Sequence, residues 1–161
     1  AAGIDNTRWA TSAAFFDYDR DGWLDLVVVN YVDYTPAQKC YDTRGAIEYC
    51  GPQNMQGTAT RLFHNLGAGA GGEVRFEEVT VPSRIAQKTG SSLGVLCADF
   101  TGDRWPDIFI TDDGQPNRLY INQRNGTFTE EATVRGLAYN AMGSTAAKVV
   151  AQAPCTVTVI R

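Results

Sequence analysis

The chain has 161 residues, of which 43% are hydrophobic and 11% are aromatic. This length and composition suit one ordinary folded domain and exclude a disordered chain. The net charge is only −4 and the 14 Lys and Arg residues are scattered, which argues against a nucleic acid or an anionic membrane as partner. No apolar run approaches the ~20 residues that a transmembrane helix needs, so we expect no membrane span.

The first distinctive segment is FFDYDRDGWLDLVVVNY, residues 15–31. Alternate side chains of a tightly wound loop converge on one point, and a glycine permits the positive φ that turns the chain. Oxygen ligands at loop positions 1, 3, 5, 7 and 9 suit a cation of the size of Ca²⁺. The predicted ligands of this first site are Asp17, Asp19, Asp21, the backbone carbonyl of Trp23, and Asp25.

This loop repels itself unless a cation is bound. Two like charges ~4 Å apart cost on the order of 4 kcal/mol at an effective dielectric constant near 20, and four carboxylates make several such pairs. A solvated acidic turn is the alternative, although every ligand position is filled. Mg²⁺ fits less well because it demands a stricter octahedral geometry. An EF-hand or dockerin loop is excluded, because position 12 is Val28 and a strand follows.

An insertion-like loop follows at about residues 32–57, rich in Gly, Pro and Tyr. It holds Cys40 and Cys50, which are ten residues apart. A disulfide would close this exposed loop and would imply an oxidising compartment, whereas two free thiols are the alternative. Cys97 lies in the apolar run LGVLCADF and is most simply a small buried side chain.

A second acidic segment, DFTGDRWPD, spans residues 99–107. It is degenerate, because threonine replaces the second aspartate and Arg104 stands where glycine belongs. A non-glycine residue with positive φ costs roughly 1–2 kcal/mol. Arg104 is therefore either an obstacle to a cation or a substitute for it. The predicted ligands of this degenerate calcium site are Asp99, Thr101, Asp103, the backbone carbonyl of Trp105, and Asp107.

These segments belong to an internal repeat. The two acidic loops are 82 residues apart, and TRLFHN at residues 60–65 recurs 57 residues later as NRLYIN. RFEEVT likewise recurs as TFTEEAT. The difference between the two offsets indicates a 25-residue insertion in the first copy, at about residues 32–57.

The repeated segments predict an all-β fold. Each is short, rich in β-branched and aromatic residues, and bounded by turn residues such as Asn125-Gly126. Each copy is then a four-stranded antiparallel unit, as in a β-propeller blade. We predict a partial β-propeller of about two blades with calcium-binding β-hairpin loops. The first blade is residues 1–80, the second is 81–139, and residues 140–161 begin a third repeat and continue as an atypical tail.

Two blades do not close a propeller, which needs at least four. We therefore expect further blades and interpret the chain as a fragment of a longer repeat protein. The last residues, KVVAQAPCTVTVIR, contain no acidic loop or turn chemistry, so this hypothesis includes a non-native tail. A genuine final hairpin from Lys148 onward is the alternative.

The segments FFDYDRDGWLDLVVVNY, RLFHN and ADFTGDRWPDIFITDDGQPNRLYINQRNGTFTEEA resemble the FG-GAP and VCBS-type repeats of integrin-alpha-like β-propellers. Within that family they look closest to the cartilage-acidic-protein-like group. The resemblance covers about residues 9–147. It implies a calcium-stabilised propeller that is secreted, and therefore extracellular or periplasmic, and that serves adhesion or extracellular recognition.

We expect a non-enzymatic recognition module with structural calcium, whose partner is a protein or a glycan. The alternative is part of a polysaccharide-acting enzyme or lectin built on the same propeller. Paired carboxylates hydrolyse glycosides when they lie ~5–9.5 Å apart across a cleft, but most aspartates here point at one centre. His64, the only histidine, is expected to be a surface or packing residue. Ser91, Ser92 and Cys97 have no local base.

Overall fold

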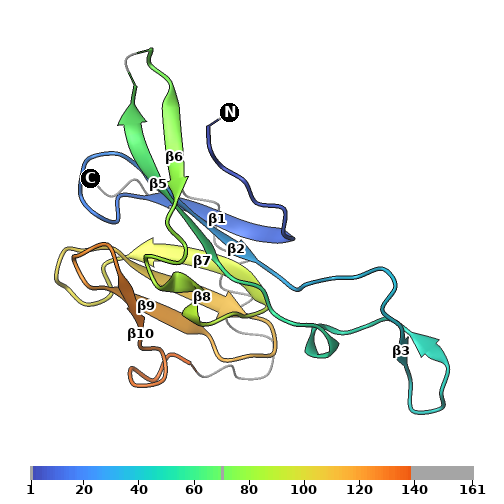
Figure 1. Ribbon diagram of the computed structural model, residues 1–161. Coiled ribbons are helices and arrows are strands. Elements are labelled where there is room, and N and C mark those ends of the chain that lie inside the picture. The colour runs from blue at the N-terminus through green and yellow to red at the C-terminus, as the bar shows by residue number, and fades with distance from the viewer. Residues whose placement is uncertain (1, 70, 139–161) are drawn as a thin grey trace.

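The computed structural model describes residues 2–69 and 71–138 and is all-β (Figure 1). Within these residues there is no α-helix, and the helical turns are two 3-10 helices, Pro52–Asn54 and Ile85–Gln87. The strands form two four-stranded antiparallel sheets and one two-stranded hairpin. This architecture confirms the predicted fold class and is consistent with a partial propeller. The predicted third repeat and tail, 140–161, lie outside the described residues.

Each four-stranded sheet is a simple meander, here called blade 1 and blade 2. Blade 1 contains β1 (Ala10–Phe16), β2 (Asp25–Asn30), β5 (Arg61–Ala68) and β6 (Val74–Glu78). Blade 2 contains β7 (Ser92–Ala98), β8 (Asp107–Asp112), β9 (Arg118–Asn122) and β10 (Phe128–Glu130). The small hairpin pairs β3 (Cys40–Tyr41) with β4 (Ile47–Glu48).

The first hairpins of the two blades have the same strand register. In the first hairpin of blade 1, Ala13 pairs with Val28, and in blade 2 the residues 82 positions later, Val95 and Ile110, pair with each other. A register shift interrupts both pairings near the start of β1 and of β7. The sequence repeat is therefore a repeat of backbone geometry.

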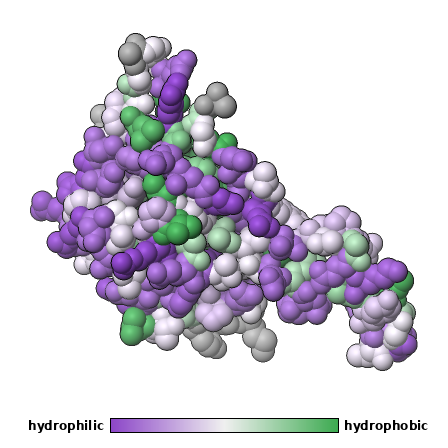
Figure 2. All heavy atoms as spheres, in the orientation of Figure 1, coloured by the Kyte–Doolittle hydropathy of each residue, from purple (hydrophilic) through white to green (hydrophobic). Residues whose placement is uncertain are grey.

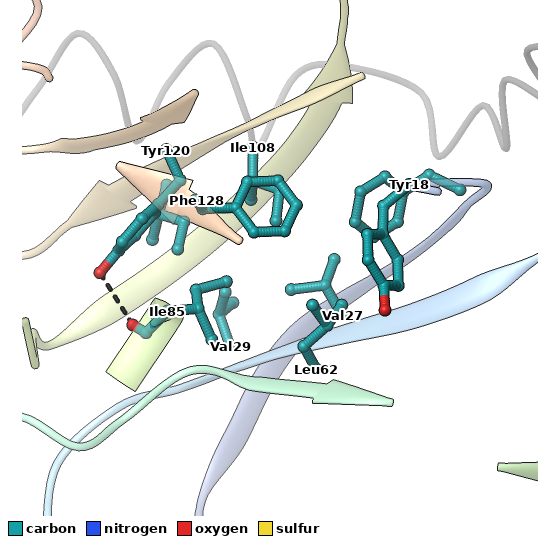
Figure 3. Packing of buried hydrophobic residues seen from close by; sticks show 10 residues of the cluster. Tyr18, Val27, Val29, Leu62, Ile85, Ile108, Tyr120 and Phe128 are labelled. Carbon is teal, nitrogen blue, oxygen red and sulfur yellow. Dashed lines mark hydrogen bonds between the residues drawn. The ribbon is translucent and has the colours of Figure 1, made fainter. Parts of the chain in front are cut away.

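The main hydrophobic core lies between the two sheets (Figure 3). Strand β2 is buried along its whole length, because alternate residues point to opposite faces and both faces are covered. Leu26 and Val28 pack with Phe63 on one face. The fully buried members of the core on the other face are Val27, Val29, Leu62, Ile85, Ile108, Ile110, Tyr120 and Phe128.

Polar contacts also join the blades. Thr11, at the register shift of β1, donates its hydroxyl to the carbonyl of Ser92 at 2.8 Å. The Tyr31 hydroxyl donates to Asp113 Oδ2 at 2.6 Å. The segment that connects the blades is also held, because the Tyr120 hydroxyl on β9 donates to the carbonyl of Ile85 in the 3-10 helix between β6 and β7 at 3.0 Å (Figure 3). The two sheets therefore meet through matched polar groups as well as apolar side chains.

Residues 32–57 leave blade 1 between β2 and β5 and project away from both blades as an arm (Figures 1 and 2). The base of the arm is closed by an antiparallel bridge between Val32 and Gly57. Near its far end, a disulfide joins Cys40 to Cys50. Cys40 is the first residue of the β3–β4 hairpin, and Cys50 follows the hairpin by two residues. The arm is therefore a constrained element rather than an open loop.

No helix within the described ranges is long and apolar enough to cross a membrane.

We expect Leu62→Ala to destabilise the protein by about 2–5 kcal/mol, because it removes a fully buried side chain from the core between the blades. Urea unfolding measures this change. Leu96→Ala on β7 is the matched control, since Leu96 is 54% exposed and exposed sites shift stability by only about 0.5 kcal/mol. Equal effects of the two substitutions would contradict the packing described above.

Candidate metal centre

The first acidic loop, loop 1 (residues 17–25), joins β1 to β2 at one end of blade 1. Its backbone winds around its own carboxylates. Asp17 accepts the backbone N–H of Asp21 at 3.1 Å and that of Gly22 at 3.0 Å, and Asp21 accepts that of Trp23 at 2.8 Å. Gly22 has a φ of 92°, the conformation that the sequence predicted for it.

This winding brings three of the predicted ligands together. Asp17, Asp19 and Asp21 each offer a carboxylate oxygen, and these oxygens lie within 4.8 Å of one another. Burial, followed by the charge of Asp21, raises the pKa of Asp19, as expected where anionic groups crowd together. The donor set fits Ca²⁺, which binds six to eight oxygens and accepts carbonyl and water ligands beside carboxylates.

Asp25, the predicted ligand at position 9, lies deeper than the other three. Its side chain is fully buried and accepts two backbone N–H groups, from Tyr18 at 3.0 Å and from Asn65 on β5 at 2.8 Å. Burial raises its pKa to about 6, although these N–H donors oppose the shift. Asp25 thus connects loop 1 to the third strand of the blade. Of the other three carboxylates, Asp19 is the one that shares a possible ligand cluster with Asp25.

His64 is the functional candidate that sequence reasoning missed. The prediction was a surface or packing residue, and the ring does pack edge-on against Tyr18, with centroids 5.9 Å apart. However, His64 Nδ1 also lies 3.0 Å from Asp25 Oδ1 and 3.4 Å from Asp19 Oδ2. The available clue was its place directly before Asn65, in the strand that pairs with β2.

The second acidic loop, loop 2 (residues 99–107), has the same winding but a different charge balance. Asp99 Oδ1 accepts the backbone N–H groups of Thr101, Gly102 and Asp103, and its Oδ2 accepts that of Arg104. Burial opposes the shift, but these hydrogen bonds together lower the pKa of Asp99. Both oxygens of the Asp99 carboxylate therefore already accept hydrogen bonds from the backbone.

A positive charge in loop 2 comes from a residue that the sequence did not suggest. Arg124, which follows β9, pairs with Asp103 Oδ2 at 2.7 Å, whereas the sequence offered Arg104 as one possible substitute for a cation in this loop. The hydrogen bond from the Trp105 backbone and the Arg124 side chain lower the pKa of Asp103. Arg104 has a φ of 71°, so it adopts the glycine conformation at its position.

The acidic side chains of loop 2 form no cluster of three possible ligands in the part of the chain that the structure describes. Among the described residues, the groups of acidic and histidine side chains close enough to share an ion contain none of Asp99, Asp103 and Asp107. The Thr101 hydroxyl donates to Asp99 at 3.3 Å, and the Trp105 N–H donates to Asp103 at 2.8 Å. This arrangement does not fit a bound Ca²⁺ as well as loop 1 does.

Asp107 repeats the structural role of Asp25. It is fully buried and accepts the backbone N–H groups of Phe100 at 3.0 Å and of Asn122 on β9 at 2.9 Å. Burial raises its pKa as well. In blade 2 the residue before this asparagine is Ile121, where blade 1 has His64.

The two loops are neighbours in space. The guanidinium carbon of Arg20 lies 5.5 Å from the centre of the Trp105 ring, a cation–π distance. Asn122 donates its side-chain amide to the carbonyl of Tyr18 at 2.8 Å. Loop 1 therefore rests directly on blade 2.

Comparison with known proteins supports the repeat assignment in part. Residues 99–151 match the family model described as an FG-GAP-like repeat. The match begins at the first aspartate of loop 2, covers less than half of the chain, and supports an FG-GAP-type repeat protein. No curated protein matches the chain, and the closer grouping with cartilage-acidic-protein-like proteins is not supported.

We expect Asp107→Ala to cost at least about 2 kcal/mol of stability, because two backbone N–H groups would lose their buried acceptor. The loss should be the same with Ca²⁺ and with a chelator, since the role is structural. Urea unfolding in both buffers measures it. Asp5→Ala, at an exposed position, is the control, and an Asp107→Ala variant as stable as this control would contradict the role.

Proposed function

We propose that the chain is a calcium-binding repeat module of a β-propeller that serves extracellular recognition or adhesion. In this proposal the ion is structural and the module is not an enzyme. The observation that carries it is the convergence of Asp17, Asp19 and Asp21 in the loop that closes the first hairpin of blade 1. FG-GAP repeats are typically extracellular, and the Cys40–Cys50 disulfide is compatible with a secreted protein.

A bound Ca²⁺ would cancel the repulsion among these carboxylates. The residues that would hold it are Asp17, Asp19 and Asp21, with the carbonyl of Trp23 as the predicted fourth ligand. Extracellular calcium modules have Kd values on the order of 10⁻⁴–10⁻³ M, which suits the calcium concentration outside cells. In loop 2 the Arg124 side chain already balances Asp103, so we propose that this loop closes without an ion.

The arm is the best candidate for the recognition surface. Tyr41, Ile47 and Tyr49 are all strongly exposed on it, and Figure 2 shows hydrophobic atoms on this projecting element. Tyrosine offers a large contact area with few rotatable bonds. The disulfide limits the conformational freedom that binding must remove. We propose a protein or a glycan as the partner of this surface.

Two observations support a role other than catalysis. The buried carboxylates Asp25 and Asp107 are both occupied by backbone N–H groups. Burial also raises the pKa of the Cys97 thiol, which disfavours the nucleophilic thiolate. A glycan array tests whether the partner is a sugar, and Tyr49→Ser should abolish that binding if the arm carries it. Release of reducing ends from polysaccharides tests the alternative of a polysaccharide-acting enzyme.

Removal of calcium should lower the stability of the protein. With about 2 mM Ca²⁺ and a Kd near 10⁻⁴ M, binding adds about 1–2 kcal/mol. We expect the melting temperature to fall when a chelator replaces Ca²⁺ and to recover when Ca²⁺ is returned. Mg²⁺ at the same concentration should restore less of the stability. Identical melting curves with Ca²⁺ and with chelator would disprove the structural-calcium proposal.

The two loops offer a matched pair of substitutions. Asp21→Asn keeps an acceptor for the Trp23 N–H but removes one charge, so it should abolish most of the calcium-dependent rise in melting temperature. The calcium-free variant should be at least as stable as the calcium-free wild type, because one repelling charge is gone. Asp103→Asn, at the same position in loop 2, should leave that rise intact. Differential scanning fluorimetry with and without Ca²⁺ separates them, and equal effects would argue against loop 1 as the calcium site.

A further inference from the structure

His64 faces more acidic oxygens than it can serve as a hydrogen-bond donor. Its Nδ1 atom lies 3.0 Å from Asp25 Oδ1 and 3.4 Å from Asp19 Oδ2, and one ring nitrogen carries at most one proton. Asp25 does not need this proton, because backbone N–H groups already occupy both of its oxygens. The imidazole therefore packs on Tyr18 and hydrogen-bonds Asp25, while a second carboxylate lies close to the same nitrogen.

Blade 2 provides an internal comparison. Asp107 accepts two backbone N–H groups in the same way as Asp25, and the residue at the position of His64 is Ile121. The hairpin of blade 2 thus closes without an imidazole. His64 is therefore an addition to the hairpin geometry that the two blades share.

The donor set fits a transition-type divalent cation. Asp19, Asp25 and His64 each offer one ligand atom, all within 4.8 Å of one another. Zinc binds imidazole nitrogen and carboxylate oxygen at about 2.0–2.2 Å, so neighbouring ligands in a tetrahedral shell lie about 3.3–3.6 Å apart. The 3.4 Å distance from His64 Nδ1 to Asp19 falls in that interval. The 3.0 Å distance to Asp25 is that of a hydrogen bond and would lengthen slightly around an ion. Imidazole suits zinc, whereas Ca²⁺ takes oxygen ligands.

We infer that Asp19, Asp25 and His64 form a second cation position, next to the proposed calcium position, that binds Zn²⁺. Asp19 belongs to both groups and would bridge the two ions. The side chains of His64 and Asp19 are partly exposed, so an ion can reach the position from solvent. Three protein ligands leave one place in a tetrahedral shell for water or for an acidic group of a partner.

The chain is well suited to a direct test, because it contains a single histidine and its imidazole NMR signals need no assignment. The experiment uses ¹⁵N-labelled protein in saturating Ca²⁺, with Cys97→Ala and Cys155→Ala removing the thiols outside the disulfide. ZnCl₂ is added, and calorimetry gives the affinity. We expect one equivalent of Zn²⁺ to bind and the imidazole nitrogen signals to shift.

His64→Ile, which copies the residue found in blade 2, should weaken Zn²⁺ binding at least about tenfold. Its calcium-dependent melting shift should stay unchanged, which also shows that the variant folds. Asp21→Asn is the converse control and should weaken Ca²⁺ binding while Zn²⁺ affinity holds. Unshifted imidazole signals, or equal Zn²⁺ affinity in His64→Ile and wild type, would overturn the inference. If Zn²⁺ binds through His64 but Ca²⁺ does not change the melting temperature, the zinc inference stands and only the calcium proposal is refuted.

Discussion

The hairpin geometry of both blades depends on one buried carboxylate at the ninth position of each acidic loop. Asp25 and Asp107 each accept one N–H group from their own loop and one from the third strand of the sheet. A single side chain thereby joins the loop, the start of the second strand and a backbone N–H group of the third strand. Burying a carboxylate is costly unless its oxygens are hydrogen-bonded, and here the backbone provides those bonds.

The sequence predicted the parts of this arrangement that are local along the chain. The repeat offset and strand composition led to two matched meanders, because side-chain alternation and turn residues act over short distances. The partners of the aspartates were harder to predict. Arg124 and His64 reach loops 2 and 1 from the third strand or just beyond it, a proximity set by strand pairing and not by sequence distance.

The two loops solve the same electrostatic problem in different ways. Loop 2 surrounds Asp99 with backbone N–H groups and pairs Asp103 with an arginine, so the protein itself balances part of its negative charge. Loop 1 keeps three carboxylates close together, and the ionisable partner beside them is the His64 imidazole near Asp19 rather than an arginine. Two nearly identical backbones thus differ in whether their stability should respond to dissolved cations, and the difference rests on a few side chains.

The position of loop 1 argues for an ion that supports the scaffold. The loop precedes β2 and the arm follows it, so the two lie at opposite ends of a six-residue strand, a length of about 20 Å. At its own end, loop 1 contacts blade 2 through the Tyr18 carbonyl and the Arg20 guanidinium. An ion that orders loop 1 would therefore act first on the contact between blades. Such an ion could order the arm only by making β2 more rigid. Strand β2 is already held in place because both of its faces are buried.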